Sequence, residues 1–355
     1  MIQYIKALVA SRNIVRLDKP ISGDLDVLEV GRIGNEDVVR VRYCAESAQE
    51  GVQSLFWDNR RGHAVVEVSC DPFLGVSDLK VIRNLGASLS TLSKPWLSGW
   101  LGDVPEDFGF EKYSRITLSN QTRAWLFTSN SNRWVIHIHG RKAAKGETLR
   151  NLKQFRDLNF KQLVISHESD AKPDGLGTKV SYLGDREWSQ VEIAVKYAKQ
   201  HGAREIILFG WSLGAMFVGQ FMKRSQCNSL VTGVIYDSPL IDYETTFQLQ
   251  SQNAGYDEDF GSYVYKILKT SKLLGLFALR RKDIPTLILP VTFPLLVLYS
   301  SSDGYVSMAK INQLLKLNRQ AKAVEILDAR HCRLFNKDEI TYQASIVDFL
   351  SSLGI

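Results

Sequence analysis

The pattern of hydrophobic and polar positions divides the chain near residue 103. Before that point, short stretches alternate apolar and polar residues and are separated by turn residues such as Gly34-Asn35; they are LDVLEVGRI (25–33), EDVVRVRYC (36–44) and HAVVEVSC (63–70). Alternation with a period of two is typical of half-buried strands. We therefore predict a β-rich N-terminal extension over residues 1–103, in which no catalytic grouping is obvious.

After residue 103, buried strands alternate with helical patterns. The predicted strands are SRITLS and RAWLFT, which form a hairpin, and then RWVIHIHG, KQLVIS, EIILFG, VTGVIYD, PLLVLYS and AVEIL. The predicted helices are GETLRNLKQFRDL, REWSQVEIAVKYAKQHG, AMFVGQFMKRS, MAKINQLLKL and SIVDFLSSL. Such alternation produces right-handed crossover units. We therefore predict that residues 104–355 form an α/β domain, with a mostly parallel sheet flanked by helices.

The most informative short stretch is LFGWSLGAM, residues 208–216. It has the spacing Gly210-x-Ser212-x-Gly214 between a predicted buried strand and a predicted amphipathic helix. Glycines are unfavourable inside a helix, and a strand that merely ended would not need small residues on both sides of a serine. The spacing and its context are those of a nucleophile elbow, a tight strand-to-helix turn that presents a serine hydroxyl. The blander interpretation is a simple turn serine.

A nucleophilic serine needs a base, and the base needs an orienting acid. His331 is the only histidine after Ser212, and it follows a predicted strand. Asp303, in VLYSSSDGYVS, also follows a strand, and we favour it as the acid. Asp237, in IYDSP, is the competing carboxylate because it too stands at the end of a strand. Asp303 has a simpler alternative role as a turn residue, and His331 as a surface histidine.

An acyl-transfer site also needs backbone N–H donors for a developing oxyanion. We expect one donor from Leu213, which follows the serine at the start of a helix, and the other from Arg141. Gly140, just before Arg141, permits the required backbone path after the WVIHIH strand. His137 and His139 are two residues apart on that strand and lack a third ligand nearby, so structural roles are favoured over a metal site.

Composition narrows the function further. The 355 residues are 45% hydrophobic and 23% charged, which is typical of a globular protein. The formal charge of +6 comes from scattered lysines and arginines, so no nucleic-acid-binding tract is expected. The start of the chain is a poor signal peptide, and no transmembrane segment is expected. Four scattered cysteines suit a reducing compartment, although a Cys44–Cys70 disulfide is the alternative in an oxidising one. No cofactor is implied.

From about Pro105 to its end, the chain resembles the serine α/β-hydrolase superfamily. It lies near the prolyl-oligopeptidase-like and esterase-like branch, and is most similar to bacterial hydrolases whose substrates are poorly defined. The stretches that carry the resemblance are WVIHIHGRKAAKGETLRNL, YLGDREWSQVEIAVKYAKQHGAREIILFGWSLGA, VIYDSPLIDY and HCRLFNKDEITYQASIVDFL. The resemblance implies that Ser212 is the nucleophile, Asp303 the acid and His331 the base. The chain departs from the family at Arg141-Lys142, where a second glycine is common, and at Tyr299-Ser300, where His-Gly is common.

The resemblance also suggests how the remaining segments are used. Residues 240–290 lie between two predicted strands, and in related folds such an insertion forms a helical cap over the serine. Related proteins often carry an N-terminal membrane anchor, and its absence here predicts a cytoplasmic protein. We therefore expect a serine hydrolase that cleaves an ester, thioester or amide through an acyl-enzyme. The alternatives are an acyltransferase with the same chemistry and a non-catalytic binding protein.

Overall fold

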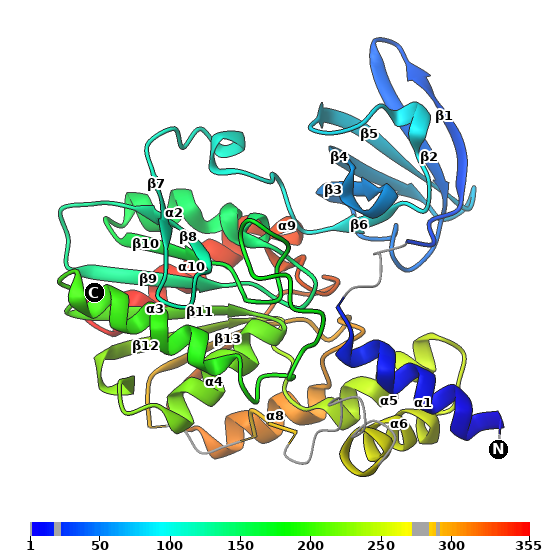
Figure 1. Cartoon of the computed structure of the whole chain (residues 1–355). Coiled ribbons are helices and arrows are strands. Elements are labelled where there is room, and N and C mark those ends of the chain that lie inside the picture. Colours follow the sequence, from blue (N-terminus) through cyan, green and yellow to red (C-terminus); the bar gives the residue numbers. More distant parts are fainter. Residues whose placement is uncertain (1, 18–22, 272–283, 289–291) are drawn as a thin grey trace.

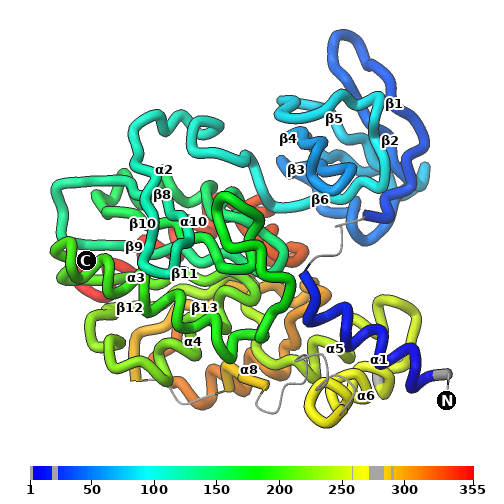
Figure 2. Tube along the Cα trace, viewed as in Figure 1, coloured from blue at the N-terminus to red at the C-terminus, as the bar shows by residue number. Residues whose placement is uncertain are grey.

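The computed structural model describes residues 2–17, 23–271, 284–288 and 292–355, and Figure 1 shows the arrangement of their elements. Two sheets organise these residues. The first is a six-stranded sheet near the N-terminus, and the second is an eight-stranded sheet that accounts for most of the remaining chain. The chain passes between them through the segment that follows β6, drawn in cyan in Figure 2.

The six-stranded sheet is antiparallel throughout and has the order β1-β2-β5-β4-β3-β6. Its strands are β1 (Val27–Ile33), β2 (Glu36–Arg42), β3 (Gly51–Trp57), β4 (Gly62–Asp71), β5 (Val76–Asn84) and β6 (Trp96–Ser98). One face carries a hydrophobic core that includes Val39, Leu55, Trp57 and Val66. The three alternating stretches identified in the sequence correspond to β1, β2 and β4.

The chain begins with a helix, α1 (Ile2–Val15), rather than a strand. This helix packs against α6 (Glu258–Thr270), where the Ser11 hydroxyl lies 3.2 Å from the Val264 carbonyl oxygen. Ala7 and Val15 are fully buried in the core of the larger sheet. The extension expected to be β-rich therefore starts with a helix that belongs spatially to the other half of the molecule, as Figure 1 shows.

The eight-stranded sheet is mixed. Its order is β14-β13-β12-β11-β9-β10-β8-β7, and its strands are β7 (Ser114–Thr117), β8 (Arg123–Phe127), β9 (Arg133–Ile138), β10 (Lys161–Ile165), β11 (Glu205–Trp211), β12 (Val231–Asp237), β13 (Leu295–Tyr299) and β14 (Ala321–Glu325). The pairs from β14 to β10 are parallel. The β8–β10 and β7–β8 pairs are antiparallel. The predicted hairpin is thus present, and it turns one edge of the sheet antiparallel.

Helices cover both faces of this sheet. They are α2 (Leu152–Asp157), α3 (Trp188–Gln200), α4 (Leu213–Arg224), α5 (Tyr243–Asn253), α6, α8 (Met308–Leu317), α9 (Leu334–Lys337) and α10 (Glu339–Ser352). Alternate residues of β11 divide between two cores: Ile206 and Leu208 face the α3–α4 side, whereas Ile207 and Phe209 face the side of α2 and α10. This alternation follows from the two-residue period of a strand.

One predicted helix was assigned too simply. Residues 146–151 of the GETLRNLKQFRDL stretch belong to the 3₁₀ segment η4 (Lys145–Asn151), and only residues 152–157 are α-helical. All seven residues of η4 are buried, so the segment has no solvent-facing side of the kind an amphipathic helix requires. A Cβ on Gly146 would lie 2.9 Å from the Gly102 carbonyl oxygen, so the loop that contains Gly102 packs directly on η4. Shorter 3₁₀ turns are η1 (Asp58–Arg60), η2 (Leu89–Thr91), η3 (Pro105–Phe108) and η5 (Asn228–Leu230).

The insertion expected as a cap over residues 240–290 contains α5 and α6, which pack on each other, and α6 also packs on α1. Part of it, residues 272–283 and 289–290, lies outside the described residues.

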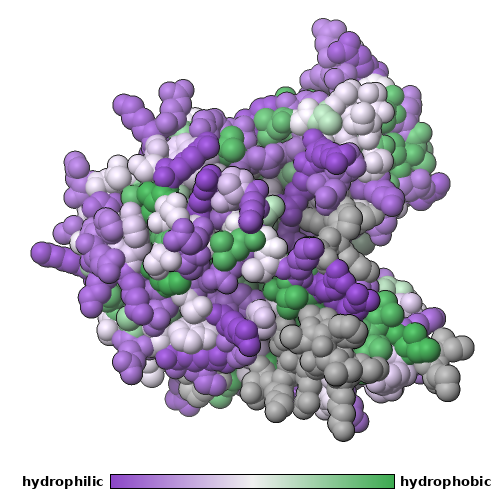
Figure 3. Space-filling model, viewed as in Figure 1, coloured by the Kyte–Doolittle hydropathy of each residue, from purple (hydrophilic) through white to green (hydrophobic). Residues whose placement is uncertain are grey.

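No helix in the described part of the chain is long and apolar enough to cross a membrane. The face shown in Figure 3 is largely hydrophilic, with apolar side chains gathered near α1 and on the outer part of the six-stranded sheet. All four cysteines are free, so the Cys44–Cys70 alternative is wrong.

Candidate active site

The predicted elbow lies where β11 ends and α4 begins. Ser212 occupies the single position between them and has φ 49° and ψ −114°, a conformation that residues with side chains rarely adopt. Backbone strain of this kind is held only where the surroundings enforce it, and it is concentrated at functional sites. The Ser212 N–H donates to the Asp237 carbonyl oxygen at 2.9 Å, which fixes the turn to the end of β12.

The two glycines of the motif are required by close packing. A Cβ on Gly214 would lie 2.2 Å from the Ile138 carbonyl oxygen, and a Cβ on Gly210 would lie 2.7 Å from the Ala215 nitrogen. Both distances are shorter than any real Cβ contact, and both involve backbone atoms that cannot move aside easily. The glycines therefore let α4 approach the ends of β9 and β11 closely, which brings the serine next to the loop after β9.

Three of the residues singled out in the sequence form a continuous hydrogen-bonded chain. The Ser212 Oγ lies 2.8 Å from His331 Nε2, and His331 Nδ1 lies 2.8 Å from Asp303 Oδ2 and 3.0 Å from Oδ1. Their positions follow β11, β13 and β14, whose carboxyl ends meet at one edge of the sheet. Asp303 is buried, while one fifth of the His331 side chain is exposed, so the serine end of the chain is accessible.

The surroundings of His331 favour the protonated imidazole more strongly than water does for an isolated histidine. Burial lowers the pKa of the imidazole, but the negative charge of Asp303 and its hydrogen bond raise it, and the net pKa is well above the usual value. The neighbouring Cys332 also raises the pKa of His331, while burial raises the pKa of its own thiol to about 11. An imidazolium formed at His331 during a reaction is therefore stabilised by Asp303.

Asp237, the competing carboxylate, has other partners. It is fully buried, and its Oδ2 accepts from the Tyr342 hydroxyl at 2.7 Å while Oδ1 accepts from the Ser238 hydroxyl at 2.9 Å. The Arg150 Nη2 lies 3.7 Å from Asp237 Oδ2. Burial raises the pKa of Asp237 more than Arg150 lowers it. Within the described residues Asp237 makes no hydrogen bond to His331, so it braces the loop beside the site.

The loop after β9 lies against the serine. A Cβ on Gly140 would be only 3.1 Å from the Ser212 Cβ, so a larger residue at this position would crowd the serine. The Gly140 N–H donates to Glu147 Oε2 at 2.8 Å, and this buried carboxylate thereby sets the direction of the loop. Leu213 is the first residue of α4, where N–H groups have no partner inside the helix. Sequence reasoning missed Glu147, whose only signal was a charged residue inside a buried stretch.

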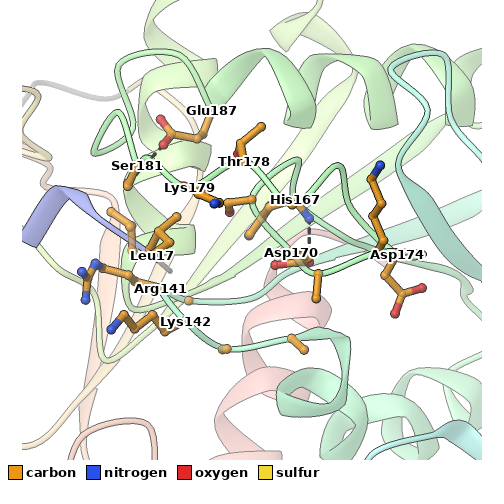
Figure 4. Close-up of a pocket in the computed structure, with 18 of the residues that line it drawn as sticks. Leu17, Arg141, Lys142, His167, Asp170, Asp174, Thr178, Lys179, Ser181 and Glu187 are labelled. Atoms are coloured by element: carbon orange, nitrogen blue, oxygen red, sulfur yellow. Dashed lines mark hydrogen bonds between the residues drawn. The ribbon is translucent and has the colours of Figure 1, made fainter. Parts of the chain in front are cut away.

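Arg141 is held by its side chain as well as by its place in this loop. Its Nη2 donates to the carbonyl oxygens of Ile14 at 2.6 Å, Asn13 at 3.1 Å and Arg16 at 3.2 Å. These carbonyls belong to the C-terminal end of α1, which has unpaired carbonyl groups and a partial negative charge. Figure 4 shows the guanidinium turned toward this helix and away from the neighbouring cavity. Arg141 thus ties the first helix of the chain to the loop beside Ser212.

His137 on β9 and His139 just after it have structural partners. Burial lowers the pKa of His137 to about 4, and its Nε2 lies 3.1 Å from Gln162 Oε1. His139 Nε2 lies 2.9 Å from Asp170 Oδ2, and the pKa of His139 is raised because Asp170 outweighs the effect of burial. No group of three metal-ligating side chains occurs in the part of the chain that the structure describes.

A second Ser–His–Asp chain occurs in the six-stranded sheet, where none was expected. Ser54 Oγ lies 2.8 Å from His63 Nε2, and His63 Nδ1 lies 2.8 Å from Asp103 Oδ2. Ser54 is fully buried in the middle of β3, and its hydroxyl donates to the Trp100 carbonyl oxygen. A buried hydroxyl whose proton is already bonded elsewhere cannot meet a substrate. This chain instead fastens the sheet to the segment that leads to the larger domain.

A cavity of about 590 Å³ opens beside the loop that follows β9. Gly140, Arg141 and Leu213 line it on the side of the serine. Figure 4 shows further lining residues from the segment after β10, among them His167, Asp170 and Lys179. A space of this volume is within the range of small-molecule sites. The candidate site therefore combines a serine hydroxyl, an imidazole hydrogen-bonded to a carboxylate, a close-packed loop and an adjoining cavity.

No protein-family model matches this chain, and no curated protein matches it. Among solved structures, it is similar to the esterase Pf2001 from Pyrococcus furiosus, with a TM-score of 0.55 and 19% identity over 71% of this chain and 94% of that one. It is also similar to the esterase EaEST from Exiguobacterium antarcticum, with a TM-score of 0.50 and 12% identity over 68% and 100% of the two chains. The α/β hydrolase GrgF from Penicillium sp. sh18 is similar with a TM-score of 0.50 and 14% identity, over 68% of this chain and 98% of that one. The part of this chain that these structures cover thus has the α/β-hydrolase fold.

Proposed function

We propose that this protein is a serine hydrolase that cleaves an ester, thioester or amide bond through an acyl-enzyme intermediate. Ser212 is the nucleophile, His331 the general base and Asp303 the orienting acid. The observation that carries the proposal is the chain of hydrogen bonds from Ser212 Oγ through His331 to Asp303, which starts at a strained elbow beside a cavity. The esterases with a similar fold are consistent with this activity.

The first half of the reaction transfers the acyl group to the enzyme. Ser212 Oγ attacks the substrate carbonyl carbon and gives its proton to His331 Nε2, which Asp303 holds in position through Nδ1. The carbonyl oxygen becomes an oxyanion, which the N–H groups of Leu213 and Arg141 stabilise. When the tetrahedral intermediate collapses, the bond to the leaving group breaks and His331 gives the leaving group its proton.

The second half releases the acid. A water molecule gives a proton to His331 Nε2 and attacks the acyl carbonyl carbon, and the bond to Ser212 Oγ breaks as the proton returns to the serine. In the acyltransferase alternative, an alcohol or amine takes the place of this water. A non-catalytic binding protein would form no acyl-enzyme at all.

Turnover of p-nitrophenyl esters with acyl chains of rising length tests the proposal. Ser212→Ala should lower kcat/KM by about 10⁴-fold or more, because no other group can form the acyl-enzyme. Ser189→Ala, an exposed serine on α3, is the matched control and should keep wild-type turnover. A Ser212→Ala variant that retains more than a few per cent of activity contradicts the assignment. Preferential acyl transfer to an added alcohol would favour the acyltransferase alternative.

A further inference from the structure

His331 is the second residue of a tight turn, residues 330–333, which we call the His331 turn. The Arg333 N–H closes this turn by donating to the Arg330 carbonyl oxygen at 2.9 Å. The turn lies in the irregular segment between β14 and α9. Irregular segments are in general less rigid than strands and helices. The position of the His331 imidazole therefore depends on the groups that hold this turn from outside.

One side chain of the N-terminal extension bonds both ends of the His331 turn. Gln49 Oε1 accepts from the Arg330 N–H at 2.8 Å, and Gln49 Nε2 donates to the Arg333 carbonyl oxygen at 3.0 Å. A glutamine amide offers both an acceptor and a donor, so one residue can bond a backbone N–H and a backbone carbonyl at once. Gln49 is buried, and its two hydrogen bonds are therefore protected from water.

Glu46 holds the two arginine side chains at the ends of the same turn. Its Oε1 lies 3.1 Å from Arg330 Nη2, and its Oε2 accepts from Arg333 Nη2. Burial raises the pKa of this carboxyl group, but the charges of Arg333 and Arg330 lower it more, so Glu46 is ionised. Arg330 also donates from Nη1 to the Ser302 carbonyl oxygen at 3.3 Å, next to Asp303. Arg330 thus links the extension to the loops of both His331 and Asp303.

The loop that carries Glu46 and Gln49, residues 43–50 between β2 and β3, is itself bonded to the six-stranded sheet. The Ser77 hydroxyl of β5 donates to the Ser47 carbonyl oxygen at 3.1 Å. The Gln53 side chain of β3 donates to the Gln49 carbonyl oxygen. All of these residues except Glu46 are buried. The two side chains that hold the His331 turn are therefore anchored to two strands.

The end of β6 approaches the His331 turn as well. A Cβ on Gly99 would lie 2.1 Å from the Cys332 carbonyl oxygen, which shows how closely the two backbones pack. Arg150 Nη1 donates to both of these residues, to the Gly99 carbonyl oxygen at 2.8 Å and to that of Cys332 at 2.9 Å. Arg333 Nη2 donates to the Leu97 carbonyl oxygen at 2.8 Å. Two separate segments of the extension thus contact this turn.

We propose that Gln49 and Glu46 are positioning residues of the hydrolase, and that through them the N-terminal extension holds His331 between Ser212 and Asp303. The inference rests on the proposed serine hydrolase function. Both residues act through the His331 turn. A displacement of this turn would lengthen the 2.8 Å contacts of His331 with Ser212 Oγ and Asp303 Oδ2. Proton transfer and stabilisation of the imidazolium would both become weaker.

Gln49→Leu tests the inference, because it removes both hydrogen bonds to the turn and keeps much of the side-chain volume. We expect kcat for a p-nitrophenyl ester to fall by about tenfold or more, with a smaller change in KM. Gln154→Leu is the matched control. Gln154 is also buried and donates to a backbone carbonyl, that of Gln343 at 2.7 Å, and its substitution should leave kcat unchanged. Melting temperatures show that each variant is folded at the assay temperature.

The pH profile of Gln49→Leu distinguishes positioning from a loss of stability. The titratable and charged side chains around His331 and on its turn are Asp303, Tyr305, Arg330, Cys332, Arg333 and Glu46. The substitution alters none of these charges. In the wild type Asp303 raises the pKa of His331, so an imidazole that has moved from Asp303 has a lower pKa. The acidic fall in kcat/KM should therefore occur at a lower pH in Gln49→Leu, whereas a folded variant that is only less stable keeps the wild-type profile.

Glu46→Gln is a second, independent variant. It keeps the shape of the side chain and loses the charge that binds both arginines, so kcat should fall by about threefold or more. If Gln49→Leu does not fold, the kcat of Glu46→Gln decides the question.

Failure of this inference differs from failure of the proposed function. If the folded variants keep the wild-type kcat, if Gln49→Leu keeps the wild-type pH profile, or if Gln154→Leu loses as much kcat as Gln49→Leu, the positioning role is wrong and the hydrolase function stands. If the wild-type protein hydrolyses no p-nitrophenyl ester and Ser212 does not react with a fluorophosphonate, the proposed function itself fails and the inference falls with it.

Discussion

Two buried carboxylates stand at neighbouring strand ends, and their hydrogen-bond partners distinguish them. Asp303 faces His331, with both of its oxygens within 3.0 Å of Nδ1. Asp237 faces Tyr342 and Ser238, and the Ser238 hydroxyl in turn accepts from the N–H of Cys332. Asp303 is therefore placed to affect His331, and Asp237 is placed to hold the loop that carries His331.

Paired substitutions at these positions should separate the two roles. Asp303→Asn should lower kcat/KM by about 10³-fold or more with little change in melting temperature, because an amide neither orients His331 nor balances its charge. Asp237→Asn should keep much of the activity but lower the melting temperature, because a buried network loses a charged acceptor. A dead Asp237→Asn enzyme together with a nearly intact Asp303→Asn enzyme would reverse the assignment.

The pH dependence of turnover reports on the same contact. His331 acts as a base only when it is neutral, and Asp303 raises its pKa above the usual value of about 6.5. We therefore expect kcat/KM to fall as the pH decreases through a pKa above 6.5. In Asp303→Asn the raising charge is lost while burial remains, so the residual activity should fall at a lower pH. If kcat/KM falls at the same pH in both enzymes, a group other than His331 controls the fall.

At the residue scale, local patterns were enough for some positions and not for others. The turn at Ser212 could be predicted because its two glycines flank the serine within five residues of sequence, between a strand pattern and a helix pattern. His331 could be predicted because no other histidine follows the serine. The choice between Asp303 and Asp237 rested on resemblance, since both follow a strand. Glu147 could not be predicted, because its role depends on a buried contact with Gly140 that no sequence period encodes.

At the element scale, α1 stands out because it connects parts of the site that are distant in sequence. Its C-terminal carbonyls accept hydrogen bonds from Arg141 in the loop after β9, and its body packs on α6 through Ser11 and Tyr4. The ring of Tyr4 lies 6.1 Å from that of Tyr263 on α6. The Val15 carbonyl oxygen also accepts from the N–H of Ser181 at 2.7 Å. The helix therefore fixes the loop beside the serine relative to the cap helices.

Arg141→Met should test this role, because methionine retains much of the side-chain volume and loses the hydrogen bonds to α1. We expect kcat to fall by about tenfold or more with a smaller change in KM, since a misplaced oxyanion donor affects the transition state most. The melting temperature should fall as well, because the carbonyls of α1 lose their partner. Arg319→Met, an exposed arginine beyond α8, is the control. A wild-type kcat in Arg141→Met would show that the hydrogen bonds from Arg141 to α1 do not affect catalysis.

The elements themselves were largely predictable, because strand and helix periods are local. The strands from β7 to β14 each correspond to a predicted stretch, as do α3, α4, α8 and α10. The exceptions depend on tertiary contacts. The segment η4 is buried on all sides, and α1 is apolar around much of its circumference, so neither shows the one-sided pattern that identifies a helix.

At the scale of the whole molecule, the N-terminal sheet is attached to the loop that carries His331. Arg333 Nη1 donates to the Glu46 carbonyl oxygen at 3.0 Å, and Arg330 Nη2 lies 3.1 Å from Glu46 Oε1. The Gln49 side chain bonds the N–H of Arg330 and the carbonyl oxygen of Arg333. The same sheet contributes Arg60 to the cavity. The extension is therefore part of the architecture of the site, a role that its alternating pattern alone did not indicate.

We propose Ser212, and not the similarly bonded Ser54, as the reactive serine. The most direct test is the reaction of the whole protein with a fluorophosphonate, followed by intact mass and peptide mapping. We predict one adduct per chain, on the peptide that contains Ser212, with no adduct in Ser212→Ala and an unchanged adduct in Ser54→Ala where that variant folds. An adduct on any other residue, or no adduct on the folded wild-type protein, would contradict the account.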